Sequence, residues 1–137
     1  MTRTERGTQP MAFNILVVDD SLTARTFVAR TLELAGVPVN QLYQARNGQE
    51  ALDVLAREWV DLVFADINMP VMNGVEMIRR MRADELLRSV PVIVITTDRS
   101  DGRMAELRAA GIQSYLTKPL TPEDLKRAVD QLLPVRG

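Results

Sequence analysis

Five polar residues stand where apolar segments of the sequence end, and their types suit phosphate chemistry. They are Asp19, Asp20, Asp66, Thr96 and Lys118. Carboxylates that lie close together repel one another, and a divalent cation such as Mg²⁺ relieves this repulsion through hard oxygen ligands. A lysine and a hydroxyl beside that cation would bind phosphoryl oxygens. Asp66 is then placed to act as a nucleophile and to accept a phosphoryl group as an aspartyl phosphate.

The apolar segments themselves predict the strands that would position these side chains. The runs at residues 13–18, 60–65 and 90–95 are short and rich in β-branched residues, which is typical of strands buried on both faces of a sheet. Weaker strand patterns cover residues 41–45 and 113–116.

Helical patterns separate these strands. The first helix has apolar residues three and four positions apart on one stripe, ending before Gly36: Ala24, Phe27, Val28, Thr31, Leu32 and Ala35. Four more helices are predicted to begin at side chains that can cap a helix: Asn47, Asn73, Ser100 and Thr121.

The order strand then helix, repeated five times, predicts an α/β fold with a doubly wound, five-stranded parallel sheet and five helices. The expected strand order is 2-1-3-4-5, as in flavodoxin-like folds, with the ligand crevice at the carboxyl ends of the first and third strands. Residues 12–134 form the expected domain, between a flexible tail at 1–11 and a short tail at 135–137. All five polar residues would then meet at one edge.

Composition excludes several classes of function. A net charge of −1 gives no basis for binding nucleic acid or an anionic membrane. The absence of cysteine and histidine excludes disulfides, thiolate metal sites, Ser-His triads and phosphohistidine carriers. The sequence contains no apolar run long enough for a membrane span and no signal-peptide pattern, so we expect a cytoplasmic protein.

Each polar residue also has an ordinary structural explanation. The acidic pair can cap a helix, Asp66 can be a turn residue, and Lys118 can be a solvated loop lysine. A threonine at a strand end, such as Thr96, commonly has only a structural role. Tyr115 on its own is typical of a half-buried aromatic residue of a strand. Their joint placement at several strand ends favours one shared site over these separate explanations.

Four motifs carry a resemblance to a known family. They are Val-Val-Asp-Asp-Ser at 17–21, Asp-Ile-Asn-Met-Pro-Val-Met-Asn-Gly at 66–74, Ile-Thr-Thr at 95–97 and Tyr-Leu-Thr-Lys-Pro at 115–119. In combination they resemble the receiver domains of two-component response regulators, particularly the CheY-like single-domain type. The resemblance covers residues 13–133.

The resemblance implies roles for the acidic residues and the lysine. Asp66 matches the phosphoacceptor, and Asp19 and Asp20 match the pair that holds Mg²⁺ directly or through water. Asn68 matches the residue whose backbone carbonyl completes the metal shell. Lys118 matches the phosphate-binding lysine.

It also implies a switch. Thr96 matches the hydroxyl that moves towards the phosphoryl group, and Tyr115 matches the aromatic residue that turns inward when it does. Asn68 and Asp98, two residues beyond Asp66 and Thr96, are expected to tune the lifetime of the phosphorylated form.

Some positions depart from the family pattern. Thr97 stands where alanine is frequent, Leu120 where an aromatic residue is common, and Asn73 where aspartate is frequent. None of these departures changes the five core residues. The family also implies a cis Lys118–Pro119 peptide bond.

Together these features imply a stand-alone response regulator that catalyses only its own phosphorylation and dephosphorylation. A histidine kinase or phosphotransfer protein would donate the phosphoryl group. An output protein would bind the face made by the helix after Ser100, the strand at 113–116 and the last helix. We expect a monomer, with a dimer on activation as the alternative. The run Asp-Asp-Ser-x-Thr-x-Arg at 19–25 resembles chemotaxis-type receivers.

Two other interpretations stay open. The chain can be a receiver excised from a multidomain regulator, or a phosphorelay intermediate. A small-molecule phosphohydrolase working through an aspartyl phosphate is the more remote alternative. It usually needs a second acid near the nucleophile and a cap over the substrate, whereas Asn68 stands two residues after Asp66 and no insertion offers a cap.

Overall fold

Strands and helices alternate along the computed structural model, which describes residues 12–112 and 114–133. The expected tails at 1–11 and 135–137 lie outside the described residues, as does residue 134. The elements in this part of the chain are β1 Phe13–Val18, α1 Leu22–Leu34, β2 Val39–Ala45, α2 Gly48–Arg57, β3 Leu62–Asp66, α3 Gly74–Ala83, β4 Val92–Thr96, α4 Asp101–Ala109, β5 Tyr115–Thr117 and α5 Pro122–Leu132.

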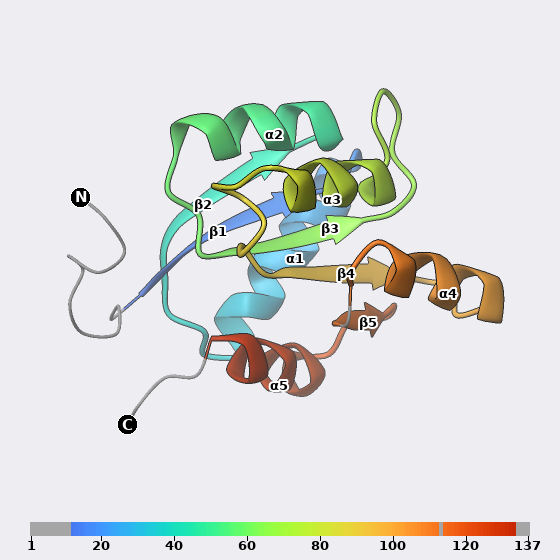
Figure 1. Ribbon diagram of the computed structural model, residues 1–137. Helices are drawn as coiled ribbons and strands as arrows, with labels where there is room; N and C mark the ends of the chain where they lie inside the picture. The colour runs from blue at the N-terminus through green and yellow to red at the C-terminus, as the bar shows by residue number, and fades with distance from the viewer. Residues whose placement is uncertain (1–11, 113, 134–137) are drawn as a thin grey trace.

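The strands form one parallel sheet in the order β2-β1-β3-β4-β5, which confirms the predicted topology. Helices α2 and α3 cover one face, and α1 and α5 cover the other (Figure 1). Helical crossovers between parallel strands place all strand carboxyl ends at one edge. That edge is where the candidate residues were expected.

The core is divided by the sheet into two apolar clusters. Ile15 and Leu16 are neighbours on β1 and are both 0% exposed, yet they belong to different clusters because successive side chains point to opposite faces. One cluster includes Met77 and Ile78 of α3, and the other includes Leu125 of α5. Burial on both faces explains why the strands read as continuous apolar runs.

The helix caps predicted at Asn47, Asn73, Ser100 and Thr121 are confirmed, and Ser21 caps the first helix. In each helix a side-chain oxygen of the residue before the first turn accepts a hydrogen bond from a backbone N–H three residues later; these caps are Ser21, Asn47, Asn73, Ser100 and Thr121. Such bonds satisfy donors that have no partner within the helix. All five caps follow loops that leave the carboxyl edge of the sheet, so they fix the ends of those loops as well.

Strand boundaries differ from the predicted ones by a few residues. β3 begins at Leu62 and β4 at Val92, although Val60 and Val90 just before them are also buried. An apolar run reports burial, whereas a strand begins only where ladder hydrogen bonds begin. β2 begins earlier than predicted, at Val39, and the predicted start of the last strand at 113 lies outside the described residues.

The stripe predicted for the first helix is wrong at one position. Val28, Thr31 and Leu32 are buried as expected, but Phe27 is 51% exposed. Helix α1 contacts α5 and the strands β1 and β2, and these contacts do not bury the Phe27 ring. In the part of the chain described here, no helix is both long and apolar enough to cross a membrane.

Candidate functional site

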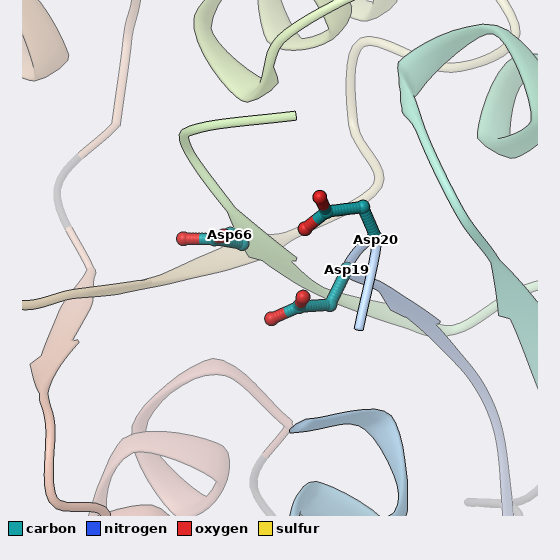
Figure 2. Close-up of side chains that lie close together, drawn as sticks. All are labelled: Asp19, Asp20 and Asp66. Carbon is teal, nitrogen blue, oxygen red and sulfur yellow. The ribbon is translucent and has the colours of Figure 1, made fainter. Parts of the chain in front are cut away.

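Three carboxylates meet at the carboxyl edge of the sheet. Strands β1 and β3 are paired with Val18 opposite Ala65, so Asp19 and Asp66 extend neighbouring strands by the same step. Oxygens of Asp19, Asp20 and Asp66 all lie within 4.8 Å of one another, and the three side chains project into one space (Figure 2). The predicted acidic cluster is therefore present, and its hard oxygen donors fit a cation such as Mg²⁺.

Asp19 is the most buried of the three, at 7% exposed. Loss of solvation on burial raises the pKa of its carboxyl, against the hydrogen bond that its Oδ1 accepts from the Ser21 backbone N–H at 2.9 Å. The nearby carboxylates of Asp66 and Asp20 raise this pKa further, while Lys118 lowers it. A bound divalent cation would remove this unfavourable balance.

Lys118, directly after β5, also lies at the carboxyl edge of the sheet. Its Nζ lies 4.0 Å from Asp19 Oδ2, and its backbone N–H donates to the Thr96 carbonyl at 3.1 Å. The Lys118–Pro119 bond is cis, as the family resemblance implied. On the other side of the acidic pair, Arg25 Nη1 donates to the Asp19 carbonyl oxygen at 2.7 Å. Both cations border the cluster from different elements.

Thr96 ends β4 and is 4% exposed. Its Oγ1 accepts from the Asp98 backbone N–H at 2.9 Å and donates to the Asp98 carbonyl at 3.3 Å. The hydroxyl thus pairs with the loop after β4 in this structure, although the strand itself lies beside β3 and Asp66. Its position at the site edge agrees with the prediction, and its hydrogen bonds were not predictable.

Asp98 points to the start of α4. Its Oδ1 accepts from the Ser100 backbone N–H at 2.9 Å, and its Oδ2 lies 3.6 Å from Arg103 Nε. The hydrogen bond from Ser100, with the nearby Arg103 charge, lowers the pKa of this exposed carboxyl. Asn68, the other residue expected to tune the phosphate lifetime, is exposed in the loop after β3.

Tyr115 is half-buried on β5, opposite Val94. Its ring packs against the core cluster beneath α2, α3 and α4. The guanidinium carbon of Arg99 lies 5.9 Å from the ring centroid, within the range of a cation–π contact. This contact of Arg99 was not predicted from the sequence, because no spacing rule links a loop arginine to an aromatic residue sixteen positions later.

The loop after β3 is held close to the backbone of Asp66. A Cβ at Gly74 would clash with the Asp66 carbonyl oxygen, so this position accepts only glycine without rearrangement. The Gly74 N–H donates to the Ile67 carbonyl at 2.8 Å, and Asp66 Oδ1 accepts from the Ile67 N–H at 2.8 Å. These contacts fix the strand end that carries the expected nucleophile.

The middle of this loop is strained. Val71 has φ +67° and is 83% exposed, and the Met72 N–H donates to the Pro70 carbonyl at 2.7 Å. This is a three-residue turn in a conformation that a β-branched residue rarely adopts. The Met72 carbonyl accepts from the Gly48 N–H at 2.9 Å, which ties the turn to the start of α2.

An apolar cleft of ≈ 160 Å³ opens beside the acidic cluster. Its lining includes Asp19 and Lys118 of the site together with Phe27, Val28 and Leu120. The exposed ring of Phe27 therefore borders the site, which gives a structural reason for its failure to join the core. The cleft leaves this side of the carboxylates open to an approaching group.

A second buried acid, which was not predicted from the sequence, lies at the opposite edge of the sheet. Asp61 is 6% exposed; its Oδ2 accepts from the Asn14 backbone N–H at 2.8 Å and its Oδ1 from Trp59 Nε1 at 3.1 Å. The sequence contains a signal for this site, because Asp61 is an acidic residue inside an apolar run. Residues 60–65 were nevertheless predicted to form one strand, with no separate role for Asp61. This network joins β1 to β3 at their amino ends.

Comparisons with known proteins agree with this fold. The family model described as the response regulator receiver domain matches residues 15–130. A chemotaxis protein CheY homolog of Campylobacter jejuni is 36% identical over 120 residues, covering 87% of this chain and 91% of that protein. The chain belongs to the response regulator receiver domain family and is CheY-like.

Two solved structures show the same architecture. The chemotaxis response regulator CheY4 of Vibrio cholerae has a TM-score of 0.78 and 32% identity, covering 90% of this chain and 100% of that chain. The receiver domain of a Pseudomonas aeruginosa sensor histidine kinase has a TM-score of 0.79 and 27% identity, covering 90% and 99%. That second structure has a magnesium ion coordinated in its active-site cleft.

Proposed function

We propose that this chain is a phosphorylation-dependent switch with Asp66 as the phosphoacceptor. The observation that carries the proposal is the gathering of Asp19, Asp20 and Asp66 within 4.8 Å at the carboxyl edge of a receiver fold. An Asp66 oxygen attacks the phosphorus of a phosphohistidine on a partner histidine kinase or phosphotransfer protein. The P–O bond forms, the P–N bond breaks, and the imidazole leaves with its electron pair.

Mg²⁺ fits the donor set of this site. Asp19, Asp20, Asp66 and the backbone carbonyl of Asn68 would hold the ion. When bound, Mg²⁺ supplies positive charge that offsets the carboxylates and the phosphoryl oxygens. Support comes from the raised pKa of Asp19, which reflects burial among like charges, and from the magnesium ion in the Pseudomonas receiver domain.

The remaining site residues bind and orient the phosphoryl group. Lys118 provides an ammonium group on the side of Asp19 away from the helix cap, where it would pair with a phosphoryl oxygen. Thr96 would turn its hydroxyl from Asp98 to another phosphoryl oxygen. The apolar cleft beside Asp19 and Lys118 leaves room for the donor's histidine to approach. Water later attacks the acyl phosphate, and Asn68 and Asp98 tune how fast this happens.

Phosphorylation would change an output surface made by α4, β5 and α5. Tyr115 belongs to this surface and shares a sheet face with Thr96, so movement of the hydroxyl alters the space beside the ring. The result is a shift in the populations of two similar conformations rather than refolding. The chain acts on its own phosphoryl group and passes the signal to an output protein.

Chemotaxis is the pathway that the relatives favour. The Campylobacter and Vibrio proteins are named as chemotaxis proteins, and the chain covers most of their length. A phosphorelay role, or a receiver within a longer regulator, is the second candidate, because receiver domains of sensor histidine kinases have similar structures.

The decisive experiment is labelling of the Asp66→Asn variant. Incubation with a phosphorylated histidine kinase and Mg²⁺ should label the wild-type protein with an acyl phosphate and leave Asp66→Asn at background. Asp53→Asn, a change at an exposed aspartate of α2, is the matched control and should be labelled like the wild type. Equal labelling of Asp66→Asn at an aspartate would refute the assignment.

A further inference from the structure

Two consecutive loop residues, Asp98 and Arg99, each contact one of the expected switch residues. The Asp98 backbone donates to and accepts from Thr96 Oγ1, at 2.9 and 3.3 Å. The neighbouring Arg99 places its guanidinium carbon 5.9 Å from the Tyr115 ring centroid. Thr96 and Tyr115 are thus each held by the segment 98–100, although no hydrogen bond joins them in the described structure.

The two switch residues are also neighbours on the sheet. Val94 is the register partner of Tyr115, and Val94 and Thr96 lie on the same face of β4 because side chains alternate along a strand. Both Val94 and Tyr115 contact the apolar cluster on that face. A change in the side-chain position of Thr96 therefore alters the space next to the Tyr115 ring.

The segment 98–100 is itself anchored to α4. Asp98 Oδ1 accepts from the Ser100 N–H at 2.9 Å, Ser100 caps the helix by accepting from the Arg103 N–H, and Arg103 Nε lies 3.6 Å from Asp98 Oδ2. If Thr96 Oγ1 turns towards Asp66, the Asp98 N–H loses its acceptor and one anchor of the segment is removed. The contact made by Arg99 depends on that same loop conformation.

We infer that Arg99 is a positioning residue for Tyr115: with the loop held by Thr96, its guanidinium retains the ring in the arrangement that accompanies an unphosphorylated Asp66. The inference rests on the proposed switch role of Tyr115. Arg99 is exposed, and a cation–π contact at an exposed site changes an equilibrium by roughly two- to fivefold. Arg99 thus biases the switch without touching the phosphoryl group.

The test compares Arg99→Ala with Arg99→Lys and with Arg108→Ala. Arg108 is an exposed arginine near the end of α4, so its variant removes the same charge at a distance from the ring. All proteins carry Tyr43→Phe, which leaves Tyr115 as the single tyrosine of the chain. Fluorine NMR of 3-fluorotyrosine at 115 reports the ring, and titration with beryllofluoride in Mg²⁺ reports affinity for a phosphoryl mimic.

The ligand-free Arg99→Ala protein should show its fluorine signal shifted towards that of the beryllofluoride-bound form. Its affinity for beryllofluoride should be roughly two- to fivefold higher. Arg99→Lys should lie close to wild type, because it keeps a cation. If only the charge of Arg99 mattered, Arg99→Ala would instead bind beryllofluoride less tightly, because loss of a positive charge near the site weakens binding of an anion. Arg108→Ala should therefore bind equally or slightly less tightly.

An unchanged fluorine signal and unchanged or weaker binding in Arg99→Ala would overturn the inference, as would an equal gain in Arg108→Ala. A different result would contradict the proposed function: the Tyr43→Phe protein without a further substitution would bind no beryllofluoride in the presence of Mg²⁺. In that case the ligand-free fluorine spectra still test Arg99, because they require no ligand. A ring signal that does not respond to Arg99→Ala would reject the positioning role.

Discussion

Two aspartates are buried to a similar extent at opposite edges of the sheet: Asp19, 7% exposed, at the carboxyl ends and Asp61, 6% exposed, at the amino ends. Both oxygens of Asp61 accept hydrogen bonds, from Asn14 and Trp59. Asp19 instead has other carboxylate oxygens within 4.8 Å and Lys118 at 4.0 Å. Burial alone therefore does not mark a functional acid. What distinguishes Asp19 is the like charge gathered around it.

The largest expected effect is on stability, at Asp61. Asp61→Ala removes the acceptor of the Asn14 N–H and of Trp59 Nε1, and each unsatisfied buried donor costs about 1–3 kcal/mol. We expect the free energy of unfolding to fall by about 3 kcal/mol. Urea unfolding at pH 7 with EDTA measures it, with Asp53→Ala as the control. A loss as small as that of the control would contradict the assigned structural role.

At Asp19 the expected change has the opposite sign. Asp19→Asn keeps an oxygen for the Ser21 N–H but removes a charge that burial and its neighbours disfavour. The metal-free variant should have a higher free energy of unfolding than the wild type. Addition of Mg²⁺ should stabilise the wild type and have little effect on the variant. A variant less stable than wild type in EDTA would show that the cluster is not under strain.

The difference in unfolding free energy between wild type and Asp19→Asn should depend on pH, because it arises from the charge on Asp19. Because the folded-state pKa of Asp19 is raised, the folded protein takes up this proton before the unfolded chain does as pH falls. The penalty for the charged form is thus present at pH 7 and disappears below the unfolded value of about 4. Unfolding of wild type and Asp19→Asn in EDTA, from pH 7 down to 4, should give converging curves. Parallel curves would exclude Asp19 titration as the source.

The smallest effect is expected at Lys118. Its ammonium lies 4.0 Å from Asp19 Oδ2 but its side chain is 37% exposed, so solvent screens the attraction. Lys118→Met in EDTA should lose less than about 1 kcal/mol at low salt, and the loss should vanish at high salt. The more negative cluster should also bind Mg²⁺ more tightly. Weaker Mg²⁺ binding would mean that the lysine helps to organise the metal ligands.

Much of the fold could be predicted because the relevant signals are local. Strand burial on both faces leaves continuous apolar runs, and the caps Asn47, Asn73 and Ser100 are read directly from residue type and position. The exposure of Phe27 could not be predicted, because its spacing fits the buried stripe of the first helix. Whether its ring is buried depends on how α1 packs against α5 and the sheet. Strand starts likewise depend on pairing with a neighbouring strand.

The site was predictable to the extent that the topology determines it. Residues at strand carboxyl ends meet whatever their separation in sequence, which brought Asp19, Asp66 and Lys118 to one edge. The hydrogen bonds of Thr96 and the contact of Arg99 with Tyr115 depend on a loop conformation that carries no periodic signal. Roles for these residues stay predictions until the switch is measured.

Val71 has a consequence for how this sequence can change. Its left-handed backbone lies between two fixed points, the Met72 carbonyl bonded to Gly48 and the close packing of Gly74 on Asp66. The shape of the turn is therefore imposed from its ends, and a β-branched residue in that conformation costs about 1–3 kcal/mol. Glycine at this position adopts the same shape without that cost. Substitution of Val71 by glycine is thus expected to relieve this strain without changing the acidic cluster of Asp19, Asp20 and Asp66.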